Sequence, residues 1–207
     1  MSPRLDKTRW LTLMASMGLP DLSDTFNHLD RAHAERHRAY HTAEHIRACF
    51  RRLDERYNLA RRPDRIELAL WFHDAVYKPM SKTNEADSAA LARDQLAPHL
   101  SEGDLDWIDQ AICLTQTHGE TTDSDTRLLL DIDLSILGAN HDVYDTYRRN
   151  IRQEYKWVPG PLYRKGRRTV LEHFLSMDHI YKRAETRADW EAQARDNLSR
   201  ELEQLNA

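Results

Sequence analysis

Apolar residues recur at intervals of three and four along most of the chain, and no stretch alternates between apolar and polar residues as a strand does. An interval of three or four places apolar side chains on one face of a helix. Only six glycines interrupt the 207 residues. The pattern therefore predicts an all-α protein.

Capping residues and helix breakers divide this pattern. A first helix is expected from Arg4 to Met17, and a second from near Asp21 or Ser23. A third opens in, or continues through, the stretch YHTAEHI (40–46) towards Tyr57. Further helices are expected over Asn84–Ala97, Glu102–Thr117, Asp125–Leu137, Asp142–Lys156, Tyr163–Ser176 and Ala184–Leu205.

The most apolar segment is RIELALWFHDAVY, which follows Pro63-Asp64. Its continuous apolar run from Ile66 to Phe72 predicts a central helix that is buried on most sides and ends near Lys78-Pro79. The chain is long enough to form one sizeable core. We expect one domain over 1–207, with N-terminal helices in 1–37 and a C-terminal helix in 182–207.

The net charge of −4 lacks the basic excess expected of a protein that coats nucleic acid. The two cysteines, Cys49 and Cys113, form no Cys-x-x-Cys pair and are too few for a disulfide framework. The N-terminus is charged, and no apolar stretch approaches the ~20 residues of a membrane span. We expect a cytoplasmic protein with reduced thiols.

His73-Asp74 at the end of the apolar run is the strongest chemical signal, because buried ionisable side chains are costly unless they are paired or bind a metal. Taken alone, such a pair is more often a hydrogen-bonded core histidine. His41 and His45, four residues apart, could share one helix face, and Asp131 and Asp133 lie in LLLDIDLSILG. Imidazole and carboxylate together suit divalent metals.

At these residues the chain resembles the HD-domain superfamily of metal-dependent phosphohydrolases, whose ligands follow the order His, His-Asp, Asp. It is most similar to a little-characterised bacterial group of predicted HD-superfamily phosphohydrolases. The matching pieces span about residues 38 to 180 and read YHTAEHI, LWFHDAVY, TNEADSA, TQTHG, DIDLSILG, YRRNIRQEY and YRKGRRTVLEHFL. The resemblance implies a single-domain, phosphodiesterase-like helical bundle.

The resemblance also implies the site. The metal ligands would be His45, His73, Asp74 and Asp133, with Asp131 supporting them or capping a helix. The spelling YHxxxH is similar to cyclic-nucleotide phosphodiesterases, in which the first histidine, here His41, is the proton donor. The ion would be Mn, Mg, Fe, Zn, Ni or Co.

Other residues have two interpretations each. Asp74 could bridge two ions, for which His118 is the one obvious extra ligand, but His118 also fits a polar loop. Glu85 could orient a water or a ligating imidazole in the catalytic centre, although Thr83-Asn84-Glu85 also reads as an ordinary helix start. Both interpretations stay open here.

The window from Tyr147 to Arg168 has a net charge of +7, from eight basic side chains and one acid. Within it, Arg152, Tyr155 and Lys156 fall within one helical turn and are candidates to bind a substrate phosphate or base, together with Lys82 earlier in the chain. The alternative is a solvated helix face paired with acidic neighbours.

We therefore expect a hydrolase that cleaves a phosphomonoester or phosphodiester bond of a nucleotide with metal-activated water. One alternative is a non-catalytic module that senses a nucleotide or binds RNA, and a minor one is a di-iron oxygenase on the same scaffold. The expected partner is a small phosphate ester. A membrane is not expected, nucleic acid is less favoured, and a homodimer is compatible with the charged C-terminal helix.

Overall fold

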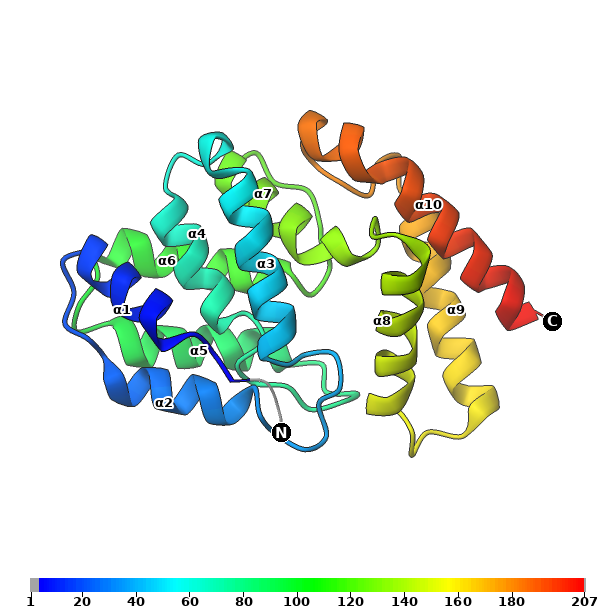
Figure 1. The fold of residues 1–207 in the computed structure, drawn as a ribbon, viewed down its shortest axis with the longest axis horizontal. Coiled ribbons are helices and arrows are strands. Elements are labelled where there is room, and N and C mark those ends of the chain that lie inside the picture. The colour runs from blue at the N-terminus through cyan, green and yellow to red at the C-terminus, as the bar shows by residue number, and fades with distance from the viewer. Residues whose placement is uncertain (1–3, 207) are drawn as a thin grey trace. The chain divides into compact units, whose positions relative to one another are not determined.

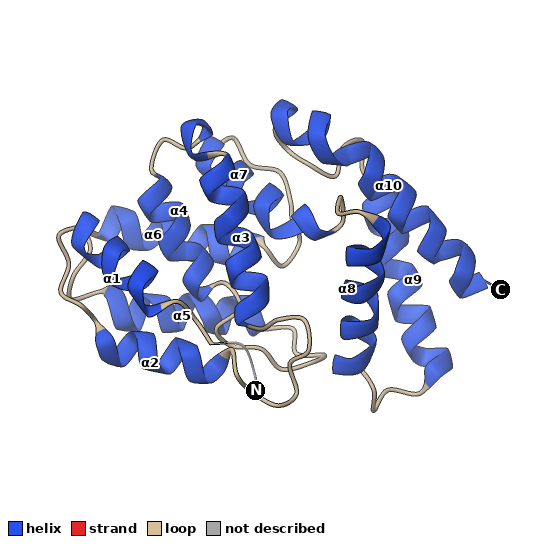
Figure 2. Cartoon of the chain, in the orientation of Figure 1, coloured by secondary structure: helices blue, strands red, loops and turns tan. Residues whose placement is uncertain are grey.

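The computed structural model describes residues 4–206, and within that range it contains helices and loops but no strand (Figure 2). The all-α class is confirmed. None of the helices in this range combines the length and the apolar character needed to cross a bilayer. The chain forms two compact units that divide between Leu129 and Leu130, and each is described by itself. The expectation of one domain over 1–207 stays a prediction.

The first unit holds the helices from α1 to the start of α7 (Figure 1). Side-chain oxygens of residues just before a helix accept hydrogen bonds from its first free N–H groups, as Asp6 does from Arg9 and Ser101 from Asp104. The unit boundary falls within α7. The bounds are α1 Lys7–Ser16, α2 Ser23–Ala32, α3 Ala43–Glu55, α4 Pro63–Phe72, α5 Asn84–Leu96, α6 Glu102–Leu114 and α7 Ser124–Asp133.

Helix α4 lies at the centre of this unit and packs against α1, α3, α5 and α6 (Figure 1). Its residues from Leu68 to Phe72 are all buried, as the apolar run predicted. The ring of Trp71 meets that of Trp10 edge-on at 5.2 Å. Burial of each such large side chain contributes about 2 kcal/mol, so this core holds α4 firmly.

The end of α4 differs from the prediction. The helix ends at Phe72 instead of near Lys78-Pro79. The backbone beyond it hydrogen-bonds to side chains instead of continuing the helix: the Val76 N–H donates to Ser88 and the Asp74 carbonyl accepts from Arg38. His73 and Asp74 therefore lie where the central helix meets a loop.

The second unit contains α8 (His141–Glu154), α9 (Gly160–Ser176) and α10 (Ala184–Asn206). Its core includes Tyr144, Tyr181 and Leu198, none of which is exposed. Arg167 and Glu201 form a buried ion pair through two hydrogen bonds of 2.9 Å, and the Tyr144 hydroxyl also donates to Glu201 at 2.6 Å. Because these hydrogen bonds satisfy both charged groups, the pair is tolerated inside the unit.

Candidate metal centre

His45 is placed by the first turns of α3. Thr42 precedes the helix in an extended conformation, and its hydroxyl accepts from the Glu44 N–H at 3.3 Å. That cap starts the helix so that His45 lies on its buried face, with 6% of its surface exposed. Thr42 therefore fixes where α3 begins, and with it the helix face on which His45 lies.

His73 has a defined tautomer. Its Nδ1 lies 2.9 Å from the Leu70 carbonyl oxygen, which can only accept a hydrogen bond, so Nδ1 carries the proton and donates. The lone pair is then on Nε2. Histidines that bind metals are commonly held in this way, with one ring nitrogen donating to a carbonyl and the other free to ligate.

Three donor atoms converge in the first unit. His45 Nε2 lies 3.1 Å from His73 Nε2, and Asp74 Oδ2 lies 3.5 Å from the former and 3.1 Å from the latter. When two ligand atoms each lie about 2.1 Å from one ion, and the ligand–ion–ligand angle is between the octahedral and the tetrahedral value, the two ligand atoms are about 3.0 to 3.4 Å apart. The set thus has the chemistry and the spacing to hold a divalent ion.

The carboxylate of Asp74 stays ionised. Burial alone would raise its pKa, but the positive charge of the imidazoles of His73, His41 and His45 outweighs that effect and holds the pKa of Asp74 well below its usual range. An ion bound to His45 and His73 would take the place of that positive charge. An ionised carboxylate is the form that ligates a metal. The same histidines that surround Asp74 therefore keep it in that form.

Arg38 ties two loops together at this site. Its guanidinium is fully inaccessible and donates to the carbonyls of His41 (3.0 Å), Asp74 (2.7 Å) and Ala75 (3.0 Å). Its Nε also donates to Glu35 at 3.0 Å. Arg38 thus fixes the loop that carries His41 against the turn that follows α4. No pattern in the sequence pointed to Arg38.

His41 does not share a helix face with His45, because α3 begins only after Thr42. The expectation of one common face is wrong for this reason. His41 lies in the preceding turn, half-buried, with its ring stacked on Tyr77 at 4.1 Å and 6.2 Å from the ring of His45. It still acts electrostatically on Asp74, which places it at the site.

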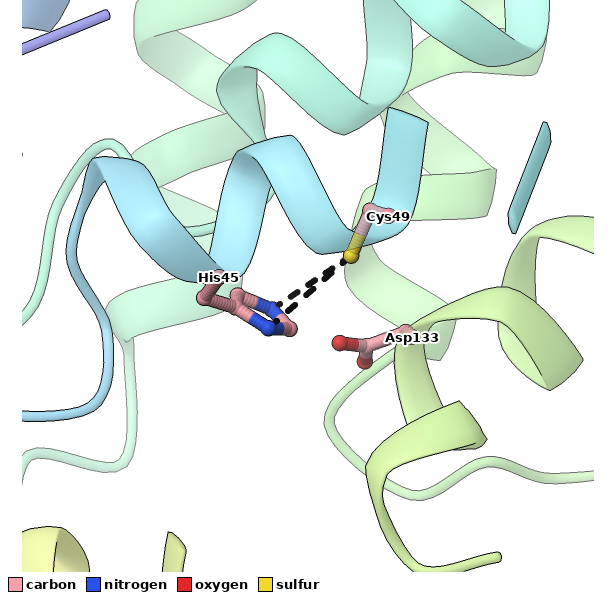
Figure 3. A group of neighbouring side chains, drawn as sticks. All are labelled: His45, Cys49 and Asp133. Atoms are coloured by element: carbon pink, nitrogen blue, oxygen red, sulfur yellow. Dashed lines mark hydrogen bonds between the residues drawn. The ribbon is translucent and has the colours of Figure 1, made fainter. Parts of the chain in front are cut away.

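Two further residues at this site had no signal in the residue spacing. Cys49 is buried one helical turn after His45, and its Sγ lies 3.7 Å from His45 Nε2 (Figure 3). His33 is fully buried, and neither ring nitrogen has a hydrogen-bond partner. Burial, followed by the charge of Arg38, lowers the pKa of His33 to about 3.

The two aspartates of DIDLS belong to the second unit. Asp131 is buried and accepts hydrogen bonds from the backbone of Lys182 (2.6 Å) and Arg183 (2.9 Å) and from the Thr186 hydroxyl (2.5 Å). Burial raises its pKa in spite of these bonds. Asp131 therefore caps the start of α10, one of the two roles expected for it. Asp133 ends α7, and its role as the fourth ligand stays a prediction.

Other candidates in the first unit have different surroundings. Glu85 lies in the first turn of α5. The pKa of the Cys113 thiol is raised mainly by burial, and the negative charges of Asp109 and Glu85 add to this effect. Lys82 is exposed, and its carbonyl accepts from Gln116. His118 is buried with a left-handed φ of 48°. Within residues 4–206, the clusters of donors that could hold an ion do not include Glu85 or His118.

The candidate substrate residues lie at the end of α8, in the second unit. Arg152 donates to the carbonyls of Tyr155 and Val158 and stacks on Tyr163. Its guanidinium is thus engaged in closing the turn between α8 and α9. Tyr155 is half-buried and Lys156 is exposed. Their assignment to a substrate stays a prediction.

Comparison with family models, curated proteins and solved structures gives no match for this chain.

Proposed function

We propose that this protein is a metal-dependent phosphohydrolase that cleaves a phosphomonoester or phosphodiester bond of a nucleotide. The observation that carries the proposal is the convergence of His45 Nε2, His73 Nε2 and Asp74 Oδ2 at 3.1 to 3.5 Å from one another. The hydrogen bond from His73 Nδ1 to Leu70 leaves the opposite nitrogen available for an ion. The resemblance to HD-domain phosphohydrolases supports the same reaction class.

The chain's own residues have distinct tasks in this proposal. His45, His73 and Asp74 would hold the ion, with Asp133 as the fourth ligand that the resemblance implies. A bound divalent ion supplies a water of lowered pKa and a positive charge that stabilises phosphoryl oxygens. Asp74 remains a carboxylate because the surrounding imidazoles lower its pKa.

His41 is the proposed proton donor to the leaving oxygen. Its ring is held against Tyr77 at 4.1 Å, and its backbone carbonyl is held by Arg38. Asp74 and a protonated His41 stabilise each other electrostatically. A proton donor held beside a metal centre, yet half-exposed, can reach a bound ester.

The nucleotide part of the proposal rests on the basic segment between Tyr147 and Arg168. Phosphate recognition there would use Lys156, with Arg152 holding the turn that carries it, and base recognition would use Tyr155. A second basic candidate, Lys82, follows the turn after α4.

The test is release of phosphate or nucleotide product from a panel of nucleoside mono-, di- and triphosphates, cyclic nucleotides and simple phosphate esters. Each is assayed with added Mn²⁺, Mg²⁺, Fe²⁺, Zn²⁺, Co²⁺ or Ni²⁺. Asp74→Asn removes a ligand, and Asp94→Asn, on the exposed face of α5, is the matched control. Metal-dependent turnover in the wild type and the control, absent in Asp74→Asn, is expected. Equal rates in Asp74→Asn would refute the proposal.

The proton-donor role has its own variant. His41→Ala should bind metal as the wild type does and lose about 10²- to 10⁴-fold in turnover of esters with poor leaving groups. Esters whose leaving group needs no proton should be affected much less. Wild-type rates with a poor leaving group would remove His41 from the mechanism.

A further inference from the structure

The turn between α8 and α9 in the second unit has an unusual surface. From residue 149 to residue 165, the exposed charged side chains are those of Arg149, Lys156, Arg164 and Lys165, all basic. The single acid in this stretch, Glu154, is buried. The turn is therefore a concentrated positive patch on a chain whose net charge is −4.

Most of this charge has no ion-pair partner among residues 4–206. Among the residues that the structure describes, Lys156, Arg164 and Lys165 form no ion pair. Arginines elsewhere in the second unit do pair, as Arg200 does with Asp145 at 2.8 Å. The alternative for this segment was a solvated helix face whose basic side chains pair with acidic neighbours. That alternative does not describe Lys156, Arg164 and Lys165.

An exposed tryptophan lies within the patch. Trp157 is 61% exposed, and Leu162, five residues later along the chain, is 56% exposed. Trp10 and Trp71 are fully buried, and Trp190 is 6% exposed. An exposed flat ring beside basic side chains without ion-pair partners is the combination on which a nucleic-acid base can stack while its phosphates are neutralised.

The turn is held in one conformation. The guanidinium of Arg152 donates to the carbonyls of Tyr155 and Val158, on either side of Trp157, and lies 4.6 Å from the ring of Tyr163. Pro159 then precedes the first residue of α9. A rigid loop loses little conformational freedom on binding, which favours affinity.

We propose that this turn binds single-stranded nucleic acid, with Trp157 stacking on a base and Lys156, Arg164 and Lys165 contacting phosphates. Stacking on one flat ring beside a positive groove is the usual way in which proteins bind single strands without sequence preference. The large apolar side chains exposed at the turn are one ring and one leucine, beside two prolines, which suits base stacking better than insertion into a bilayer. Binding at this turn requires no hydrolysis at the metal centre, although Lys156 is shared with the nucleotide-recognition residues of the proposed function.

The first measurement is fluorescence anisotropy of a short labelled oligodeoxythymidine, and of the matching oligouridine, titrated with the full chain. Three or four phosphate contacts predict that log K falls against log salt with a slope of about −2 to −3. The double variant Lys156→Ala/Lys165→Ala removes two phosphate contacts and should make the slope of log K against log salt less steep by about 1.4. Arg31→Ala, an exposed basic residue on α2, should leave it unchanged.

The stacking part is tested by Trp157→Ala, which should weaken binding about 5- to 150-fold. Trp157→Phe should retain most of the affinity, and Tyr57→Ala, which removes a ring that is 59% exposed in the first unit, is the matched control. Quenching of tryptophan fluorescence on binding should disappear in Trp157→Phe.

Several outcomes would overturn the proposal. One is binding that depends on charge but not on Trp157, and another is equal affinity for a DNA duplex. A third is attachment to phosphatidylserine vesicles without oligonucleotide binding, which would make the turn a membrane anchor. Asp74→Asn should bind the oligonucleotide as the wild type does, and loss of binding in this variant would place the nucleic acid at the metal centre instead. Because binding is measured without turnover, failure of this proposal can be told apart from failure of the proposed hydrolase function.

Discussion

Replacement of Arg38 by methionine removes the donor that joins the two loops of the candidate site. Methionine preserves much of the side-chain length, but the carbonyls of His41, Asp74 and Ala75 lose their partner. A buried acceptor left without a partner costs about 1 to 3 kcal/mol. One buried carbonyl, that of Ala75, and two part-buried ones therefore predict a loss of about 3 kcal/mol in the free energy of unfolding.

Urea titration followed by tryptophan fluorescence measures this loss, because Trp10 and Trp71 lie in the core of the same unit. With a urea dependence of about 2 kcal/mol per molar, the midpoint should fall by about 1.5 M. Arg38→Lys should recover only part of it, since an ammonium cannot span three carbonyls. Arg36→Ala, at an exposed position, is the control. A midpoint shift below about 0.3 M for Arg38→Met would refute the role assigned to this guanidinium.

Three other variants test separate features. The pKa of His33 is lowered to about 3 from an ordinary 6.5, so the unfolded chain binds a proton on this side chain more tightly, and the free energy of unfolding decreases as pH falls through that window. His33→Phe lacks this proton-binding site. Between pH 7 and pH 4 its free energy of unfolding, measured by urea titration, should therefore decrease less than that of the wild type, by on the order of 3 kcal/mol. Gly138→Ala should cost about 1 to 3 kcal/mol in thermal unfolding, because a Cβ there would lie 2.6 Å from Trp190 Cβ. Asp131→Ala should lower stability by about 2 kcal/mol yet retain metal, whereas Asp133→Ala should lose metal; retained metal in both would remove Asp133 from the site.

The helices could be predicted closely because their limits depend on neighbours in the sequence. Asn84 begins α5 and Ala184 begins α10, both as expected. The apolar run from Ile66 also revealed the central helix. Other boundaries were wrong: α7 ends at Asp133 instead of Leu137, and α9 begins at Gly160 instead of Tyr163. At the end of α4 the cause was contacts with Arg38 and Ser88, which are distant along the chain.

The candidate site was predictable only in part, for the same physical reason. His45, His73 and Asp74 carry a signal because ionisable side chains are rare beside buried apolar residues. Arg38 carries none, since its partners are backbone carbonyls up to 37 residues away and any sequence supplies carbonyls. Burial of His33 likewise depends on tertiary packing, which residue spacing does not encode.

The most direct test of the metal centre is the metal content of the purified, dialysed protein, measured by mass spectrometry for the wild type, Asp74→Asn and Asp94→Asn. We predict a near-stoichiometric divalent transition ion in the wild type and in Asp94→Asn, and its loss in Asp74→Asn. Because His73 Nε2 and His45 Nε2 lie 3.1 Å apart, both nitrogens are within ligand distance of a single ion placed beside them. A wild-type protein that takes up no divalent ion, even after incubation with excess Mn²⁺, Zn²⁺ or Co²⁺, would contradict the account.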